Sequence, residues 1–208
     1  MADGMGTSGG NNLAEIDMVN ELVGKFVERA ATLAEGIQQL KRDGMEISEH
    51  YEDEEIAAVV KQIAADYVQF EAWLNHLLTE EEIPDGIIAL NFGLFEEEDG
   101  VRLYVSGSKA FDVENFDWAA DNDYFPDGRY ADIDVYHSFQ DMLESDFSLG
   151  LYLSLAASVL YILTYARQNR GLLIKRNEQL HLTTGFDDGG LFYLGTVSKL
   201  GFQVVHGK

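Results

Sequence analysis

The N-terminal part of the chain carries apolar side chains at the spacing of α-helices. From Leu13 to about Lys41 the apolar residues recur every three or four positions, which predicts one continuous helix. A second helix is expected to begin near Asp53, with acidic residues in its first turn that complement the helix dipole, and to end before Pro84. The two are expected to form a long antiparallel hairpin over residues 13–82, in which each helix covers the apolar stripe of the other.

After Pro84 the period changes to the two-residue alternation of β-strands. Apolar residues alternate over 88–94 and again over 101–105, and Asp99-Gly100 lies between the two runs. An Asp-Gly pair accepts the positive φ angles of a tight turn. The pattern therefore predicts a central β-hairpin.

The C-terminal half returns first to helix and then to strands. A helical region is expected from about His137 to Arg170, with an interruption near 146–150. Beyond it, turn residues at 187–190 separate short apolar runs, and strands are predicted at 172–174, 179–184, 191–197 and 202–205. No parallel βαβ repeat is visible, so the predicted fold class is α+β with C-terminal antiparallel strands.

One apolar stretch has two interpretations. Residues 147–166 contain no charge and are long enough to cross a bilayer. Within them, Ser154, Ser158, Tyr161 and Tyr165 recur at helical spacing and form a weakly polar stripe. We interpret the stretch as a buried apolar helix at the centre of the fold, with a membrane span as the alternative.

The composition is that of a folded protein with a strong negative charge. The chain has 208 residues, of which 46% are hydrophobic, so it can bury a core of ordinary size in a single domain. It contains 37 acidic residues against 14 Lys and Arg, which gives a formal net charge of -23. Direct binding of nucleic acid is not expected, because neutralising phosphates requires basic side chains on the contact face.

The N-terminal residues MADGMGTSGGNN have neither a basic start nor an apolar run. They are therefore expected to form a flexible leader over residues 1–12, native or left from a tag, and not a signal peptide or anchor. A single α+β domain is expected over 13–208, in which 83–208 mixes sheet and helix. The chain has no cysteine, which excludes disulfides and fits a reducing compartment, so the expected location is the cytoplasm.

The segment from Phe111 to Tyr136 combines acidic and aromatic residues. It holds eight carboxylates and seven aromatic rings against a single base, Arg129. Carboxylates create a negative field and large aromatic rings anchor interfaces, so the segment is predicted to bind a basic protein. The candidate binding residues are Asp112, Glu114, Asp117, Trp118, Asp121, Asp123, Tyr124, Phe125, Asp127, Asp132 and Asp134. Trp118 has a second interpretation as a core residue beneath the loop.

A calcium-binding loop is the main chemical alternative for this segment. Asp123, Asp127, Gly128 and Asp134 occupy positions 1, 5, 6 and 12 of a twelve-residue calcium loop. The match is incomplete, because position 3 is Phe125 and position 12 is Asp where a bidentate Glu is expected. No metal site or cofactor is assigned, and a carboxylate site for Ca²⁺ or Mg²⁺ stays open.

Catalytic motifs do not stand out in the sequence. It contains no P-loop, no zincin motif and no hydrolase elbow, and its five histidines are scattered without ligand spacing. No catalytic residue is assigned, and we expect a protein that is not an enzyme. A metal-dependent enzyme using the carboxylates of 112–134 is the alternative, together with a soluble α+β interaction domain of another role.

Three segments resemble bacterial immunity proteins that neutralise polymorphic or contact-delivered toxins. These segments are GSKAFD at 107–112, NFDWAADNDYFP at 115–126 and GFDDGGLFYLG at 185–195. The resemblance implies a non-enzymatic inhibitor that is made in the same cytoplasm as its toxin and binds it tightly. Toxins that cut nucleic acid carry basic clefts, so a nuclease domain is one candidate partner for an acidic inhibitor. The oligomeric state stays open.

Overall fold

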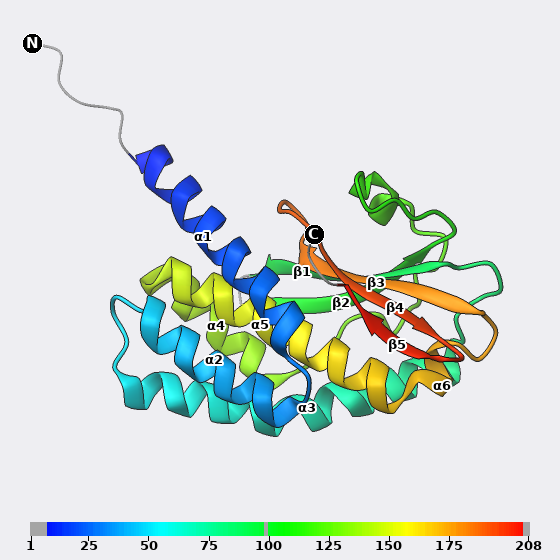
Figure 1. Cartoon of the computed structure of the whole chain (residues 1–208), viewed down its shortest axis with the longest axis horizontal. Helices are drawn as coiled ribbons and strands as arrows, with labels where there is room; N and C mark the ends of the chain where they lie inside the picture. The colour runs from blue at the N-terminus through cyan, green and yellow to red at the C-terminus, as the bar shows by residue number, and fades with distance from the viewer. Residues whose placement is uncertain (1–7, 98–99, 206–208) are drawn as a thin grey trace, which may run out of the picture.

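Helices cover one face of a five-stranded sheet in the computed structural model, which describes residues 8–97 and 100–205 (Figure 1). This arrangement confirms the predicted α+β class. The elements are α1 (Ser8–Arg29), α2 (Leu33–Ile47), α3 (Asp53–Glu80), β1 (Ala89–Glu97), β2 (Gly100–Ser108), η1 (Phe116–Ala120), α4 (Asp134–Ser145), α5 (Phe147–Gln168), α6 (Arg170–Leu173), β3 (Gln179–Phe186), β4 (Phe192–Ser198) and β5 (Gly201–Val204).

The predicted first helix consists of two helices. α1 ends at Arg29, and Thr32 caps the start of α2. The Thr32 hydroxyl donates to the Glu35 carboxylate at 2.8 Å, and the Glu35 amide donates to Thr32 Oγ1 at 3.2 Å. The prediction of one continuous helix was wrong because the apolar positions on both sides of the break stay in phase. α1 begins at Ser8, inside the segment expected to be a leader.

The predicted helical hairpin is formed by α2 and α3. The two helices run antiparallel on the side of the molecule away from the sheet (Figure 1). α3 begins at Asp53 as expected, and its first turn holds a capping box between Glu52 and Glu55. α1 instead packs along α5. The pair α2 and α3 together with α1 encloses α5 against the sheet.

The predicted central hairpin is confirmed, and β1 pairs with β2 antiparallel from Ala89 opposite Ser108 to Glu97 opposite Gly100. Asp99 of the expected Asp-Gly turn lies outside the described residues. The strand order is β2-β1-β3-β4-β5. The strands β3, β4 and β5 form the predicted antiparallel meander.

Two details of the sheet prediction were wrong. β1 and β3 pair in parallel at the centre of the sheet, although no parallel pairing was visible in the sequence. The connection between these strands contains the acidic segment and three helices, so it does not have the length of a simple βαβ unit. The strand expected at 172–174 is instead the end of the short helix α6, because so short an apolar run fits either conformation.

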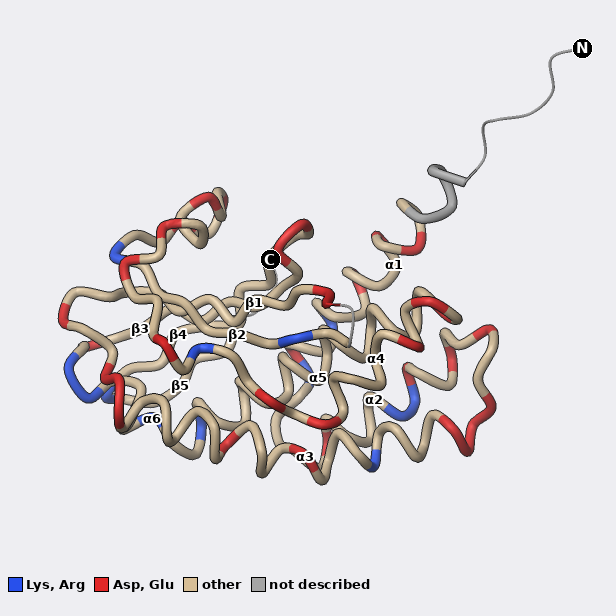
Figure 2. The backbone as a smooth tube through the Cα atoms, turned by 180° about the vertical axis from the view of Figure 1, so that it is seen from behind, with Lys and Arg blue, Asp and Glu red and all other residues tan. Residues whose placement is uncertain are grey.

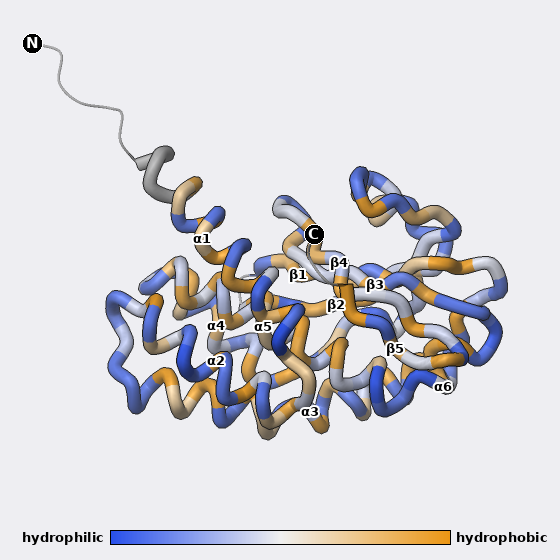
Figure 3. Tube along the Cα trace, in the orientation of Figure 1, coloured by the Kyte–Doolittle hydropathy of each residue, from blue (hydrophilic) through white to orange (hydrophobic). Residues whose placement is uncertain are grey.

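The apolar stretch is the buried helix α5, as predicted. By length and composition α5 is the only helix of the described part of the chain that meets the requirement for crossing a membrane, but most of it is buried inside the protein. Figure 3 shows the hydropathy of each residue along the chain. Its polar stripe is satisfied within the core. Tyr161 donates its hydroxyl to the Ile63 carbonyl at 2.6 Å, and Tyr165 donates to Asn75 Oδ1 at 2.8 Å.

The two faces of the sheet differ in chemistry. The inner face carries Leu90, Phe92 and Leu94 on β1, which are buried against the helices. The alternate positions of β1 and β2 lie on the outer face, where Gly93 pairs with Tyr104. This outer face carries polar and aromatic side chains, and the acidic segment crosses it.

Candidate binding site

The acidic segment forms a strap, defined here as residues 109–133, that rises from the end of β2 and returns along the same strand. η1 lies in the strap and stands away from the sheet (Figure 1). Gly107 and Tyr124 exchange backbone hydrogen bonds of 2.8 and 2.9 Å, and the Ala131 amide donates to the Leu103 carbonyl at 2.9 Å. The returning half of the strap therefore pairs with the free edge of β2 and is held in place by it.

The C-terminal end of α3 fixes the middle of the strap. The Glu81 carboxylate accepts hydrogen bonds from the Asp127 amide at 2.7 Å and from the Gly128 amide at 2.8 Å. Trp73 Nε1 donates to the Gly128 carbonyl at 2.9 Å, and the Tyr124 hydroxyl donates to the Glu81 carbonyl at 2.6 Å. These bonds hold the strap as an ordered surface, because each one satisfies a backbone group.

Two candidate anchors of the binding surface are buried supports of the strap. Trp118 is 5% exposed, and its Nε1 donates to the Asp112 carbonyl at 3.1 Å. Tyr124 is equally buried, with its hydroxyl on Glu81. The core interpretation of Trp118 is therefore correct, and neither ring is presented to a partner. Phe125 is exposed, as its candidate role requires.

An aromatic stack joins the strap to the outer face of the sheet. The Phe111 ring lies parallel to the His181 ring, with ring centroids 3.9 Å apart. The Trp118 ring also contacts Phe111, with ring centroids 5.3 Å apart. His181 Nδ1 shares a hydrogen bond of 2.9 Å with the Tyr193 hydroxyl. The first half of the strap is thus fastened to β3 and β4.

We expect the histidine of this stack to make stability depend on pH. Burial lowers the pKa of His181 below its ordinary value of 6.5, so the unfolded chain binds a proton more readily than the folded one. The stability that neutral His181 contributes is present above the unfolded pKa and is lost as the pH falls below it. Urea unfolding between about pH 7.5 and about pH 5.5 is expected to show a smaller loss of stability for His181→Gln than for the wild type.

His76→Gln is the matched control, because His76 is exposed on α3 and takes no part in the stack. It is expected to keep the full pH dependence of the wild type. A pH dependence that His181→Gln leaves unchanged would contradict the role of this half-buried imidazole.

A cavity of about 620 Å³ lies between the strap, the outer face of the sheet and the turn that joins β3 to β4. Its polar lining comes from β1, the strap and that turn, and consists of Asn91, Asp117, Asn122 and Asp187. Its aromatic lining consists of Phe95, Tyr104, Phe116, Phe125 and Tyr130. Acidic and aromatic groups therefore meet in a concave site, and not only along a surface.

The floor of the cavity is ordered by hydrogen bonds. The Tyr104 hydroxyl donates to Asp187 Oδ1 at 2.6 Å, and burial together with this carboxylate raises the pKa of Tyr104. The phenol therefore stays protonated at neutral pH. The ring lies over Gly93, where a Cβ atom would fall 2.2 Å from it, so the Tyr104 ring can take this position only over a glycine. Thr183 donates its hydroxyl to Asn91 Oδ1 at 3.0 Å.

The predicted acidic residues are spread along the strap and do not form one cluster (Figure 2). Asp117 is the only one of them among the lining residues of the cavity. Asp123 pairs with Lys109, whose amide donates at 2.9 Å and whose Nζ lies at 3.3 Å. These contacts, led by the amide hydrogen bond, lower the pKa of Asp123. Asp134 begins α4 and accepts a hydrogen bond from Gln69 on α3.

The remaining acidic residues of the strap either stabilise its local structure or are exposed on its surface. Asp112 accepts the Glu114 amide at 2.8 Å, which closes a tight turn. Asp132 Oδ1 lies 3.6 Å from His137 Nε2. Asp121, Asp127 and Glu114 are exposed. Sequence reasoning did not place Asp187 among the candidate binding residues, because its turn at 187–190 was interpreted as a strand connection and as part of the resembling segment 185–195.

The partial calcium loop is not assembled as a metal site. Asp123 binds Lys109 and Asp134 binds Gln69, so two of its carboxylates have other partners. Within residues 8–97 and 100–205, no three His, Asp or Glu side chains gather as a metal centre would require.

No protein-family model matches the chain, and no curated protein or solved structure gives a match.

Proposed function

We propose that the protein is a cytoplasmic immunity or inhibitor protein, without enzymatic activity, that binds a basic protein partner through its strap. The observation that carries the proposal is the combination of exposed carboxylates with a strap whose backbone is fixed by β2 and by Glu81. An ordered acidic surface suits recognition, because little conformational freedom is lost when it binds. The resemblance of three segments to toxin immunity proteins points to the same class of function.

Electrostatics supports a basic partner. The strap acids Asp121, Asp127 and Asp132 are exposed, and the formal net charge of the chain is -23. A field of this sign accelerates the approach of a basic protein and repels nucleic acid and other acidic proteins. For a nuclease toxin, carboxylates on the strap would occupy the places where the substrate phosphates bind, and the inhibitor would thereby block its basic cleft.

Neutralising the exposed strap acids is expected to slow association with the partner. The test needs a toxin domain with a basic surface, and the gene immediately upstream is the first place to search for one, as the basic C-terminal domain of a long protein. The triple variant Asp121→Asn, Asp127→Asn, Asp132→Asn is expected to reduce the association rate constant about tenfold at low salt and to flatten its dependence on ionic strength. Stopped-flow fluorescence over a series of salt concentrations measures both quantities.

The matched control removes the same charge elsewhere, with Asp17→Asn, Asp141→Asn and Glu178→Gln, which are exposed and lie outside the strap. It is expected to change the rate far less, because charges far from an interface are screened. Equal rates for the two triple variants would reject the strap as the binding surface.

A further inference from the structure

The cavity beside the strap combines two features that recognise an organic cation. Carboxylates reach it from two separate elements, Asp117 from η1 and Asp187 from the turn after β3. Aromatic rings line the space between them. Its volume of about 620 Å³ is that of a site for a small ligand or for an inserted side chain.

The aromatic wall is built from rings that contact one another. Phe95 lies 5.9 Å from Tyr104 and 5.8 Å from Tyr130, measured between ring centroids. Aromatic faces carry partial negative charge and attract cations, most strongly when water is excluded. Among the described residues, the guanidinium groups near this wall lie over Phe125 and Tyr130. Phe95, Tyr104 and Phe116 also line the cavity.

The same wall shows which cation it suits. The guanidinium of the chain's own Arg129 lies 3.9 Å from the Phe125 centroid and 4.5 Å from the Tyr130 centroid. A guanidinium is planar and weakly hydrated, so it stacks on rings and also pairs with carboxylates through two parallel N–H bonds. An ammonium group is a point charge and gains less from this combination.

A buried amide adds a second recognition element. Asn91 is 4% exposed and lines the cavity, and its side-chain oxygen is taken by the Thr183 hydroxyl. A side-chain amide carries two N–H donors besides its oxygen, so Asn91 can donate a hydrogen bond to a ligand carbonyl in the cavity. A residue within a peptide supplies both a cationic side chain and such a carbonyl.

We propose that this cavity receives an arginine side chain of the partner, stacked on the aromatic wall and paired with Asp117 and Asp187. The inference rests on the proposed function, since it names the group by which the basic partner engages the protein. The Tyr104 hydroxyl, which donates to Asp187 at 2.6 Å, holds that carboxylate in place for the pairing. The exposed acids of the strap then guide the partner, and the cavity secures one of its residues.

The test uses the full chain and a blocked arginine peptide, acetyl-Gly-Arg-Gly-amide, titrated by NMR or calorimetry. The peptide is expected to bind with a dissociation constant in the millimolar range, about tenfold tighter than its lysine counterpart, and the uncharged citrulline counterpart is expected not to bind. The double variant Asp117→Asn, Asp187→Asn is expected to weaken arginine binding at least about tenfold, because it removes both charged acceptors.

Two further variants test whether a loss of peptide binding reflects this cavity, and not the overall charge of the protein or its misfolding. Asp17→Asn, Asp141→Asn removes the same charge from exposed positions outside both the cavity and the strap, and is expected to leave peptide binding unchanged. Gly93→Ala moves the Tyr104 ring, which has only 2.2 Å to an added Cβ, and is expected to abolish binding while circular dichroism stays that of a folded protein.

Each outcome decides the inference. Equal binding of the arginine and citrulline peptides, or equal effects of the two double variants, would overturn it. Tighter binding of tetramethylammonium than of the arginine peptide would also overturn it, in favour of a site for a small organic cation. These titrations contain no partner protein, so their failure leaves the proposed function standing. Conversely, an arginine peptide that binds while the basic domain does not would refute the proposed function alone.

Discussion

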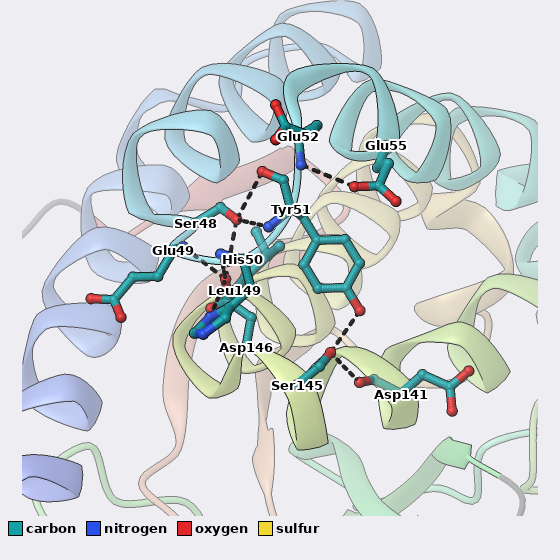
Figure 4. A network of polar contacts seen from close by, with 10 residues as sticks. All are labelled: Ser48, Glu49, His50, Tyr51, Glu52, Glu55, Asp141, Ser145, Asp146 and Leu149. Carbon is teal, nitrogen blue, oxygen red and sulfur yellow. Dashed lines mark hydrogen bonds and ion pairs between the residues drawn. The ribbon is translucent and has the colours of Figure 1, made fainter.

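Replacing Asp146 with alanine is expected to lower the free energy of unfolding by about 3 kcal/mol, although the residue lies far from the strap. Asp146 is 4% exposed and separates α4 from α5. Its carboxylate accepts hydrogen bonds from the amides of Glu49 at 2.8 Å, His50 at 3.1 Å and Leu149 at 3.2 Å (Figure 4). One side chain therefore joins the connection between α2 and α3 to the start of α5.

The size of the effect follows from what alanine leaves behind. The buried Leu149 amide and the partly buried amides of Glu49 and His50 would lose a charged acceptor, and an unsatisfied buried donor costs about 1–3 kcal/mol. Ser48, whose hydroxyl donates to the same carboxylate at 3.1 Å, would keep only its hydrogen bonds with Tyr51. Urea unfolding followed by circular dichroism measures the change.

Two further variants test this explanation. Asp141→Ala removes an exposed carboxylate from the same helix pair and is expected to change stability by less than about 0.5 kcal/mol. Asp146→Asn keeps one oxygen and the shape of the side chain, so it is expected to fall between the wild type and alanine. If Asp146→Ala were as stable as Asp141→Ala, the carboxylate would not be holding the two connections together.

Local patterns in the sequence were sufficient to predict the helices that bury an apolar surface. α3 begins at Asp53 and ends before Pro84 as predicted, because its acidic first turn and the proline mark its limits. The polar stripe of α5 correctly indicated a core helix, since Ser158 and Tyr161 find hydrogen-bond partners within the protein. In both cases the signal lies within one segment.

Features that depend on distant segments were not predictable in this way. The parallel pairing of β1 with β3 joins strands that are separated by three helices, and nothing in either strand specifies the direction of its neighbour. The break at Thr32 was missed because the apolar period continues across it. Both outcomes reflect tertiary packing overriding a local pattern.

The same distinction applies to the candidate site: its local composition was predictable, but its contacts between distant segments were not. The acidic and aromatic composition correctly drew attention to the strap, but it did not reveal which rings turn inward. Trp118 and Tyr124 are buried, and Asp187 joins the cavity from a turn more than fifty residues beyond the strap. A cavity formed by separate segments becomes visible only when the fold brings them together.

Trp118→Ala is expected to destabilise the protein by about 3 kcal/mol, as truncation of a buried aromatic ring does. The variant removes the contact with Phe111 and leaves the Asp112 carbonyl without its indole donor. Phe111 in turn stacks on His181, so the loss reaches the sheet. Urea unfolding measures the global change, and hydrogen exchange of the strap amides shows whether residues 111–123 open first.

Two other substitutions separate support from contact. Trp118→Phe keeps an aromatic ring and is expected to lose only about half as much stability, because it forgoes the indole hydrogen bond and part of the buried area. Val113→Ala changes an exposed apolar residue of the same strap and is expected to stay near the wild type. If Trp118 were instead a direct contact, Trp118→Ala would leave unfolding unchanged and weaken partner binding. If Trp118 is a support, Trp118→Ala lowers both the stability and the affinity for the partner. A strap that opens no longer presents its acidic residues, and it no longer forms one wall of the cavity.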